Sequence, residues 1–272
     1  MNLTDTHCHL NLKTYQDDLA DVLTRARENG VKRVLVPALD IESSREVLQL
    51  AENLEMVYAA VGVHPNSAQT WNSNSIEELF ELASHPKVVG IGEIGLDYYR
   101  DRAPKSTQKK VLSEQLQIAR SKQLPVILHV RNRTEDDRSC IQDLLSILDD
   151  WISTGEPLPP EMGGRAGVIH SFSGNLKESK QALELGFFIG ITGAITFKKA
   201  DNLRDVVKHM PLTRLLIETD GPFITPHPYR GKRNEPAHVR YIVDKISEVT
   251  GKPQEMITEQ TGVNAAGLFR WE

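Results

Sequence analysis

The sequence predicts an α/β fold, specifically a (β/α)8 barrel of the TIM type, on three observations. Eight short apolar runs alternate with longer amphipathic runs, which indicates parallel strands joined by helical crossovers. The apolar runs are rich in Val and Ile on both faces, as a sheet covered on both sides requires. The chain has 272 residues, a length at which such barrels form one domain, so we expect a single domain over residues 1–272.

The expected elements follow in strict order along the chain. The strands are Leu3–His7, Arg33–Val36, Val57–Val63, Val88–Glu93, Val126–Val130, Gly167–Ser171, Phe187–Thr192 and Leu215–Thr219. The helices between them are Asp17–Glu28, Ile41–Asn53, Ser75–Ser84, Thr107–Lys122, Glu135–Trp151, Leu176–Leu185 and Ala200–His209. An open doubly wound sheet is the main rival, but no Gly-x-Gly-x-x-Gly fingerprint follows the first strand.

Two segments complete this pattern. Helices over Glu235–Thr250 and Pro253–Phe269 are expected after the last strand, separated by Gly251, and Pro253 suits a helix start. The loop Ser153–Arg165 is rich in Pro and Gly. We expect it to be a peripheral insertion at the N-terminal face of the barrel.

Composition narrows the class of protein. The net charge of −5, from 37 acidic and 32 basic residues, argues against a general nucleic-acid coat but allows a local basic rim. It does not favour an anionic membrane, and no apolar run reaches the roughly 18 residues of a membrane helix. The two cysteines, Cys8 and Cys140, indicate no disulfide framework. With no visible signal peptide, a cytoplasmic protein without an obligate protein partner is expected.

The first expected strand carries two candidate metal ligands. Side chains alternate between the faces of a strand, so His7 and His9 should point the same way, with Asp5 below them. Two imidazoles on one face can hold a divalent cation. Cys8 should point away and pack as a small apolar side chain.

Further candidate ligands stand at the C-terminal ends of other expected strands, where barrel active sites are built. They are Glu93, His129, His170 and Asp220. Our interpretation is a site for two divalent ions, with His7, His9 and Asp220 on one ion, His129 and His170 on the other, and Glu93 bridging. Such a pair would generate hydroxide at neutral pH, and Asp220 would accept the proton of the water.

The ligand set also suggests the metal and its supporting groups. Mixed nitrogen and oxygen ligands suit Zn²⁺ or Mn²⁺ better than Mg²⁺. Asp5 and Glu218 share the parity of the ligands on their strands. They are candidates for hydrogen bonds to the histidines, or for buried polar groups at the barrel mouth.

These residues resemble the TatD family of metal-dependent hydrolases, within the wider amidohydrolase group. The matching motifs span nearly the whole chain in family order: Asp5–Leu10, Val61–Pro65, Gly92–Asp97, Leu128–Arg131, His170–Gly174, Glu218–Asp220 and Arg230–Pro236. The resemblance implies a barrel, one or two divalent metals, and phosphodiester hydrolysis at a DNA 3′ end. It places the family's metal ligands on the same six residues. Val130, Asn132 and Gly221 depart from the family's usual residues without touching a ligand.

Several residues are expected on the substrate side. His64 is a candidate proton donor or phosphate contact, with a structural loop histidine as the alternative. Candidate phosphate-binding cations follow the fifth, seventh and eighth strands: Arg131, Lys198, Arg230, Lys232 and Arg233. Tyr98 and Tyr99 could stack on a base, although packing beneath a loop is favoured. No ligand role is expected for the remaining histidines: His85, His209, His227 and His238.

The leading functional hypothesis is a two-metal phosphodiesterase, a 3′ to 5′ exodeoxyribonuclease with Glu93, Asp220 and His64 as catalytic residues. Metal-activated hydroxide also attacks carbonyl carbon, so an ester or amide hydrolase such as a D-aminoacyl-tRNA deacylase is the alternative. The basic residues after the eighth strand, Arg230, Lys232 and Arg233, favour a substrate that carries phosphate. Both DNA and tRNA meet this condition. A metal-binding scaffold without catalysis is the third hypothesis, which the complete ligand set disfavours.

Overall fold

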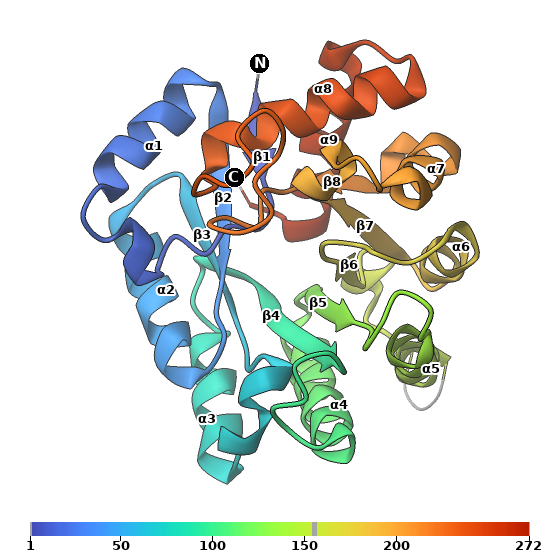
Figure 1. Cartoon of the computed structure of the whole chain (residues 1–272). Helices are drawn as coiled ribbons and strands as arrows, with labels where there is room; N and C mark the ends of the chain where they lie inside the picture. The colour runs from blue at the N-terminus through green and yellow to red at the C-terminus, as the bar shows by residue number, and fades with distance from the viewer. Residues whose placement is uncertain (1, 154–156, 272) are drawn as a thin grey trace.

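Eight parallel strands form one sheet in the order β1 to β8 within residues 2–153 and 157–271, which the computed structural model describes. The strands are β1 (Leu3–Asp5), β2 (Val31–Pro37), β3 (Val57–Val61), β4 (Val88–Asp97), β5 (Val126–Arg131), β6 (Gly167–Ile169), β7 (Phe187–Ile191) and β8 (Leu215–Ile217). They curl into a nearly closed barrel, as Figure 1 shows. The predicted fold class is confirmed.

Helices surround this sheet in chain order (Figure 1). They are α1 (Leu19–Glu28), α2 (Ile41–Asn53), α3 (Ser73–Leu82), α4 (Lys105–Lys122), α5 (Ser139–Ser153), α6 (Leu176–Glu184), α7 (Asp201–His209), α8 (Val239–Thr250) and α9 (Gln254–Phe269). Side chains cap the starts of some of these helices. The side chains of Asp40, Asn72 and Asn175 accept backbone N–H groups at the starts of α2, α3 and α6, which satisfies donors that a helix start leaves free.

Several boundaries differ from the expectation at the strand ends. The sequence predicts a first strand to His7 and a last strand to Thr219, but β1 ends at Asp5 and β8 at Ile217. The segments beyond them still meet, through an isolated bridge between Cys8 and Gly221. They bend as they close the barrel, so regular ladders stop early.

The two ends of the barrel are filled differently. Interior residues of the strands, among them Leu35, Ile127 and Leu216, form one apolar cluster with Leu268 and Trp271 at the C-terminal end of the chain. Helix α9 packs against β1 and β8 (Figure 1) and thus closes the N-terminal end of the barrel. The opposite end is left for polar side chains.

The loop after α5 takes part in this closed end. The segment Ser153–Arg165 is expected from the sequence to be a peripheral insertion at the N-terminal face, and it lies at that end with most of residues 157–165 exposed or half-buried, but two of its side chains are buried; residues 154–156 lie outside the described part of the chain. Met162 is fully buried, and Arg165 is buried and donates from Nε to the Leu268 carbonyl oxygen at 2.9 Å. The loop therefore fixes the end of α9 to the barrel.

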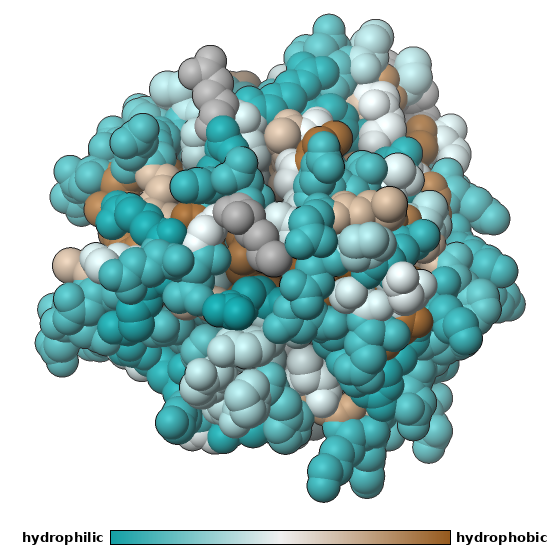
Figure 2. Space-filling model, turned by 90° about the horizontal axis from the view of Figure 1, so that it is seen from above, coloured by the Kyte–Doolittle hydropathy of each residue, from teal (hydrophilic) through white to brown (hydrophobic). Residues whose placement is uncertain are grey.

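The outer surface is mostly hydrophilic in the view of Figure 2, where apolar residues show as small separate areas. Among residues 2–153 and 157–271, no helix combines the length and the apolar character needed to span a membrane.

We predict that Leu268→Ala lowers the free energy of unfolding by about 2–5 kcal/mol, because it opens a cavity where α9 fills the barrel. Val263→Ala is the matched control, since Val263 lies on the same helix and is 60% exposed. It should change stability by less than about 0.5 kcal/mol. Urea denaturation followed by circular dichroism measures both, and equal effects would contradict the packing role of α9.

Candidate metal centre

Four side chains from three parts of the chain surround one point at the C-terminal end of the strands. His7 Nε2 and His9 Nε2 lie 3.3 Å apart. Glu93 Oε2 lies 3.4 and 3.5 Å from these nitrogens, and Asp220 Oδ1 lies 3.8 and 3.7 Å from them. Donor atoms about 2.0–2.1 Å from a tetrahedral ion lie about 3.3 Å from one another. The spacing therefore fits a divalent cation with mixed nitrogen and oxygen ligands.

The second carboxylate oxygen of Glu93 faces a different set of imidazoles. Glu93 Oε1 lies 2.8 Å from His129 Nδ1 and 3.7 Å from both His64 Nε2 and His170 Nε2. Glu93 is 2% exposed, so it lies between the two sets beneath the surface. The structure thus brings together all six residues expected as ligands and adds His64, which the sequence suggested as a proton donor or phosphate contact and not as a ligand.

Outer hydrogen bonds hold the rings in these positions. His170 Nδ1 lies 3.0 Å from Glu218 Oε1, and His9 Nδ1 lies 3.3 Å from the Pro37 carbonyl oxygen. A Cβ atom at Gly190 would lie 2.4 Å from Glu218 Oε1, so only glycine leaves room for that carboxylate. Partners of this kind fix the tautomer and orientation of metal-binding histidines.

Asp5 has the other of its two expected roles. Its carboxylate accepts hydrogen bonds from the Thr219 backbone N–H at 2.8 Å and from the Thr219 hydroxyl at 2.5 Å. It contacts the backbone of His7 but not its ring. Asp5 is therefore a buried polar group that joins the ends of β1 and β8.

Asp97 is a residue of the site that the sequence reasoning missed. Its Oδ2 lies 3.4 Å from His129 Nε2 and accepts a hydrogen bond from Asn66. Its Oδ1 accepts the backbone N–H groups of Tyr99 and Arg100. The signal was available, because Asp97 shares the strand parity of Glu93.

Burial and neighbouring charges both shift the pKa values of the ionisable side chains in the candidate metal centre. Burial raises the pKa of Asp220 to about 7 and lowers that of His64 to about 3. Burial also opposes the charge on His129, but the neighbouring carboxylates of Asp97 and Glu93 outweigh it and raise its pKa to about 9. The carboxylates thus favour positive charge at the centre of this cluster of histidines and carboxylates. A bound cation would take the place of protons on the imidazoles.

The cations expected on the substrate side are exposed with one exception. Arg131, Lys198, Arg230 and Lys232 are exposed. The Arg131 guanidinium lies 4.0 Å from the ring centroid of Tyr99, and that of Arg230 lies 4.0 Å from Phe197. These positions leave the charges accessible at the barrel mouth.

Arg233 is used differently. Its guanidinium donates to both carboxylate oxygens of Asp18, at 2.7 and 2.6 Å, and to the Thr14 carbonyl oxygen. The structure therefore does not bring Arg233 to the cluster. The bidentate ion pair ties the loop after β8 to the start of α1.

The remaining aromatic and histidine residues fall outside the cluster. Tyr98 is buried with its hydroxyl on Asp143, as the packing interpretation expected, whereas Tyr99 is 54% exposed. The other histidines have partners elsewhere: His85 with Glu52, His209 with Asp205, His227 with Phe197, and His238 with Tyr229. Cys8 and Cys140 are buried and unpaired.

Two departures from the family's usual residues have structural reasons. A Cβ atom at Gly221 would lie 2.8 Å from Cys8 Sγ and 2.6 Å from the Tyr15 hydroxyl, so these neighbours require glycine here. Asn132 Oδ1 accepts the Ile141 backbone N–H at 3.2 Å near the start of α5. The structure gives no comparable reason for Val130.

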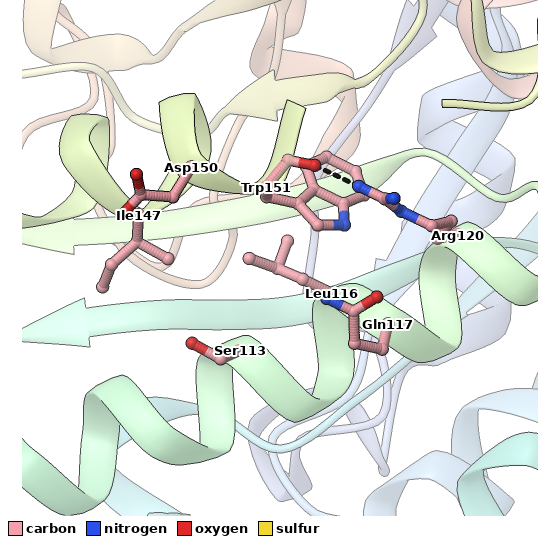
Figure 3. A pocket seen from close by; sticks show the side chains of 7 residues that line it. All are labelled: Ser113, Leu116, Gln117, Arg120, Ile147, Asp150 and Trp151. Atoms are coloured by element: carbon pink, nitrogen blue, oxygen red, sulfur yellow. Dashed lines mark hydrogen bonds between the residues drawn. The ribbon is translucent and has the colours of Figure 1, made fainter. Parts of the chain in front are cut away.

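A separate hollow of about 180 Å³ lies between α4 and α5, outside the barrel (Figure 3). Its described lining residues, such as Leu116, Ile147 and Trp151, include none of the expected site residues. Arg120 donates from Nη2 to the Trp151 carbonyl oxygen across it.

Fold and site together define a class. A parallel barrel in which histidines and carboxylates converge at the C-terminal ends of the strands is the architecture of a metal-dependent hydrolase. The TatD related DNase family model matches residues 4–270. The chain therefore belongs to the TatD family of metal-dependent hydrolases.

Similar proteins support this assignment. The chain is 39% identical over 270 residues to a protein of Bacillus subtilis named an uncharacterized metal-dependent hydrolase, YabD, with 98% of this chain and 99% of that protein covered. It is 32% identical over 270 residues to a protein of Salmonella typhimurium named 3'-5' ssDNA/RNA exonuclease TatD, with 97% and 98% covered. Among solved structures, the TatD homologue YJJV of Escherichia coli superposes with a TM-score of 0.88 at 35% identity, covering 100% of this chain and 99% of the other.

We predict that Asp97→Asn weakens affinity for Zn²⁺ or Mn²⁺ roughly 10- to 100-fold, because an amide N–H₂ facing His129 cannot accept its ring proton. Asp136→Asn, at an exposed position of the loop before α5, should leave affinity unchanged. Titration calorimetry measures both, with thermal unfolding to show that each variant folds. Unchanged affinity in Asp97→Asn would refute the positioning role.

Proposed function

We propose that the protein is a divalent-metal-dependent phosphodiesterase that removes nucleotides from the 3′ end of DNA. The observation that carries the proposal is the position of Glu93, whose two carboxylate oxygens face two separate sets of imidazoles. A single carboxylate between two sets of donors is what a pair of neighbouring cations requires. The name of the Salmonella relative, a 3'-5' ssDNA/RNA exonuclease, supports the choice of substrate.

In this proposal the six expected ligands divide between two ions, although the His170 ring also stacks on that of His7 with the ring centroids 3.5 Å apart. His7, His9 and Asp220 would hold one ion, His129 and His170 the other, and Glu93 both. Divalent cations bound there would polarise the phosphoryl group and lower the pKa of water toward neutrality. Zn²⁺ and Mn²⁺ suit this set of nitrogen and oxygen donors better than Mg²⁺.

Asp220 and His64 would handle the proton and the phosphate oxygens. The Asp220 side chain is 12% exposed, so a substrate at the mouth can reach its carboxylate, which would accept the proton of the attacking water. His64 Nδ1 accepts the Asn66 backbone N–H at 3.0 Å. The neutral ring therefore carries its proton on Nε2, toward Glu93, where it would donate to a phosphoryl or leaving-group oxygen.

Exposed cations at the mouth would hold the rest of the substrate. Lys198 follows β7, while Arg230 and Lys232 lie on the loop after β8. Cations on these two loops often bind phosphate in barrels. They give a chain of net charge −5 a local site for a polyanion.

We predict that Asp220→Asn lowers turnover of 5′-labelled single-stranded DNA about 10²- to 10⁴-fold, because the amide cannot accept the proton of water. Chelation with EDTA should abolish turnover and added Mn²⁺ or Zn²⁺ should restore it. His209→Ala, a histidine outside the cluster, is the control and should keep full activity.

Two outcomes would overturn the proposed function. One is undiminished turnover by Asp220→Asn with metal still bound. The other is hydrolysis of D-aminoacyl-tRNA, assayed in parallel, by a metal-loaded enzyme that leaves DNA intact.

We also predict that Arg230→Ala raises KM for an oligonucleotide roughly fivefold, as expected for an exposed ion pair. It should flatten the slope of log affinity against log salt by about 0.7. Arg233→Ala is the matched control, because the Arg233 guanidinium is bound to Asp18; it should reduce thermal stability and leave KM unchanged. A lower kcat at unchanged KM in Arg230→Ala would contradict the phosphate contact.

A further inference from the structure

Phe223 is a large apolar side chain that stays open to solvent beside the candidate metal centre. It is 53% exposed, and its ring centroid lies 6.2 Å from that of His9 in a T-shaped arrangement with an interplanar angle of 69°. Other exposed aromatic rings are covered by cations: Phe80 by Lys122 and Tyr99 by Arg131. Within residues 2–153 and 157–271, the ring of His9 is the one aromatic ring paired with that of Phe223.

The backbone of Phe223 is held firmly although its side chain is open. Its N–H donates to the Asp220 carbonyl oxygen at 2.8 Å, and its carbonyl oxygen accepts from Asn234 Nδ2 at 2.7 Å. Asn234 is fully buried and also donates to the Thr219 carbonyl oxygen. The backbone of Phe223 is therefore fixed relative to Asp220 before any substrate arrives, which keeps the ring beside the candidate metal centre.

An exposed phenyl group on an anchored backbone is suited to one kind of ligand. It offers a face to a planar ring and no hydrogen bond, so it accepts any aromatic base without reading its identity. In a nucleotide the base stands a few ångströms from the phosphate. A phosphodiester drawn into the cluster would therefore bring a neighbouring base to Phe223.

Resting on the proposed function, we propose that Phe223 is a stacking platform for an unpaired nucleobase next to the scissile phosphodiester. The cluster lies below the surface, with Glu93 and His9 only 2% and 4% exposed. The end of a DNA strand that is still base-paired cannot reach these buried residues unless it separates from the complementary strand. The platform takes the freed base and thereby favours single-stranded or frayed ends.

The test combines variants of Phe223 with substrates that lack a base. The metal-loaded enzyme is given a 5′-labelled single-stranded oligonucleotide, or the same strand with a tetrahydrofuran abasic residue at its last or its penultimate position. Stacking on one base contributes roughly 5- to 100-fold. For the wild-type enzyme, kcat/KM should be lower by that factor on one of the abasic strands than on the intact strand. For Phe223→Ala on the intact strand, kcat/KM should be lower by the same factor than for wild type.

The proposal is supported if the effect of each substitution depends on whether the substrate carries the base. Phe223→Ala should cut that abasic strand as fast as wild type does, Phe223→Trp should retain the preference for the intact strand, and Phe223→Leu should behave like Phe223→Ala. Equal loss on intact and abasic strands, or no loss on either, would overturn the stacking role while leaving the nuclease intact. If wild type cuts none of the strands with metal bound, the proposed function fails and takes this inference with it.

Discussion

The geometry of the candidate metal centre depends on the hydrogen bonds that close the barrel between its first and last strands. The His7 carbonyl oxygen accepts the Asp220 N–H at 2.8 Å, and the His9 N–H donates to the Gly221 carbonyl oxygen at 2.8 Å. Asp5 clasps Thr219 just below. Because these bonds join the segments that carry three of the candidate ligands, a shift of one segment would separate the donor atoms. The narrow fit of Gly221 against Cys8 and Tyr15 follows from the same close approach.

The two ends of the barrel serve opposite purposes. At the N-terminal end, α9 fills the interior with apolar side chains and Arg165 anchors it. At the other end, Glu93, Glu218 and Asp97 are buried among histidines, an arrangement that is costly unless every charge is paired. Glu93 meets this condition by contacts on both of its oxygens. The apolar packing at the N-terminal end stabilises the fold and offsets the cost of burying charged side chains at the opposite end. This division suits a site that needs charges in fixed positions.

The loop after β8 combines rigid and exposed parts in a short stretch. Arg233 binds the loop to α1, and the buried Asn234 binds it to the residues around Asp220. Phe223, Arg230 and Lys232 lie on the same loop with their side chains toward solvent. A substrate would therefore meet an aromatic ring and two cations whose supports are already in place, so little ordering would remain to be done on binding.

The sequence by itself determined the alternation of strands and helices, and with it the barrel and the positions of six histidines and carboxylates at its mouth, because strand periodicity and parallel topology send such residues to one end. It could not decide which neighbours each side chain would meet. Arg233 and Arg230 look alike in a basic run, yet only Arg233 finds Asp18, a partner far away in the chain. The role of Asp97, the inclusion of His64 and the exposure of Phe223 likewise depend on contacts between distant segments. Such contacts are set by the closure and packing of the whole barrel, and no local pattern records them.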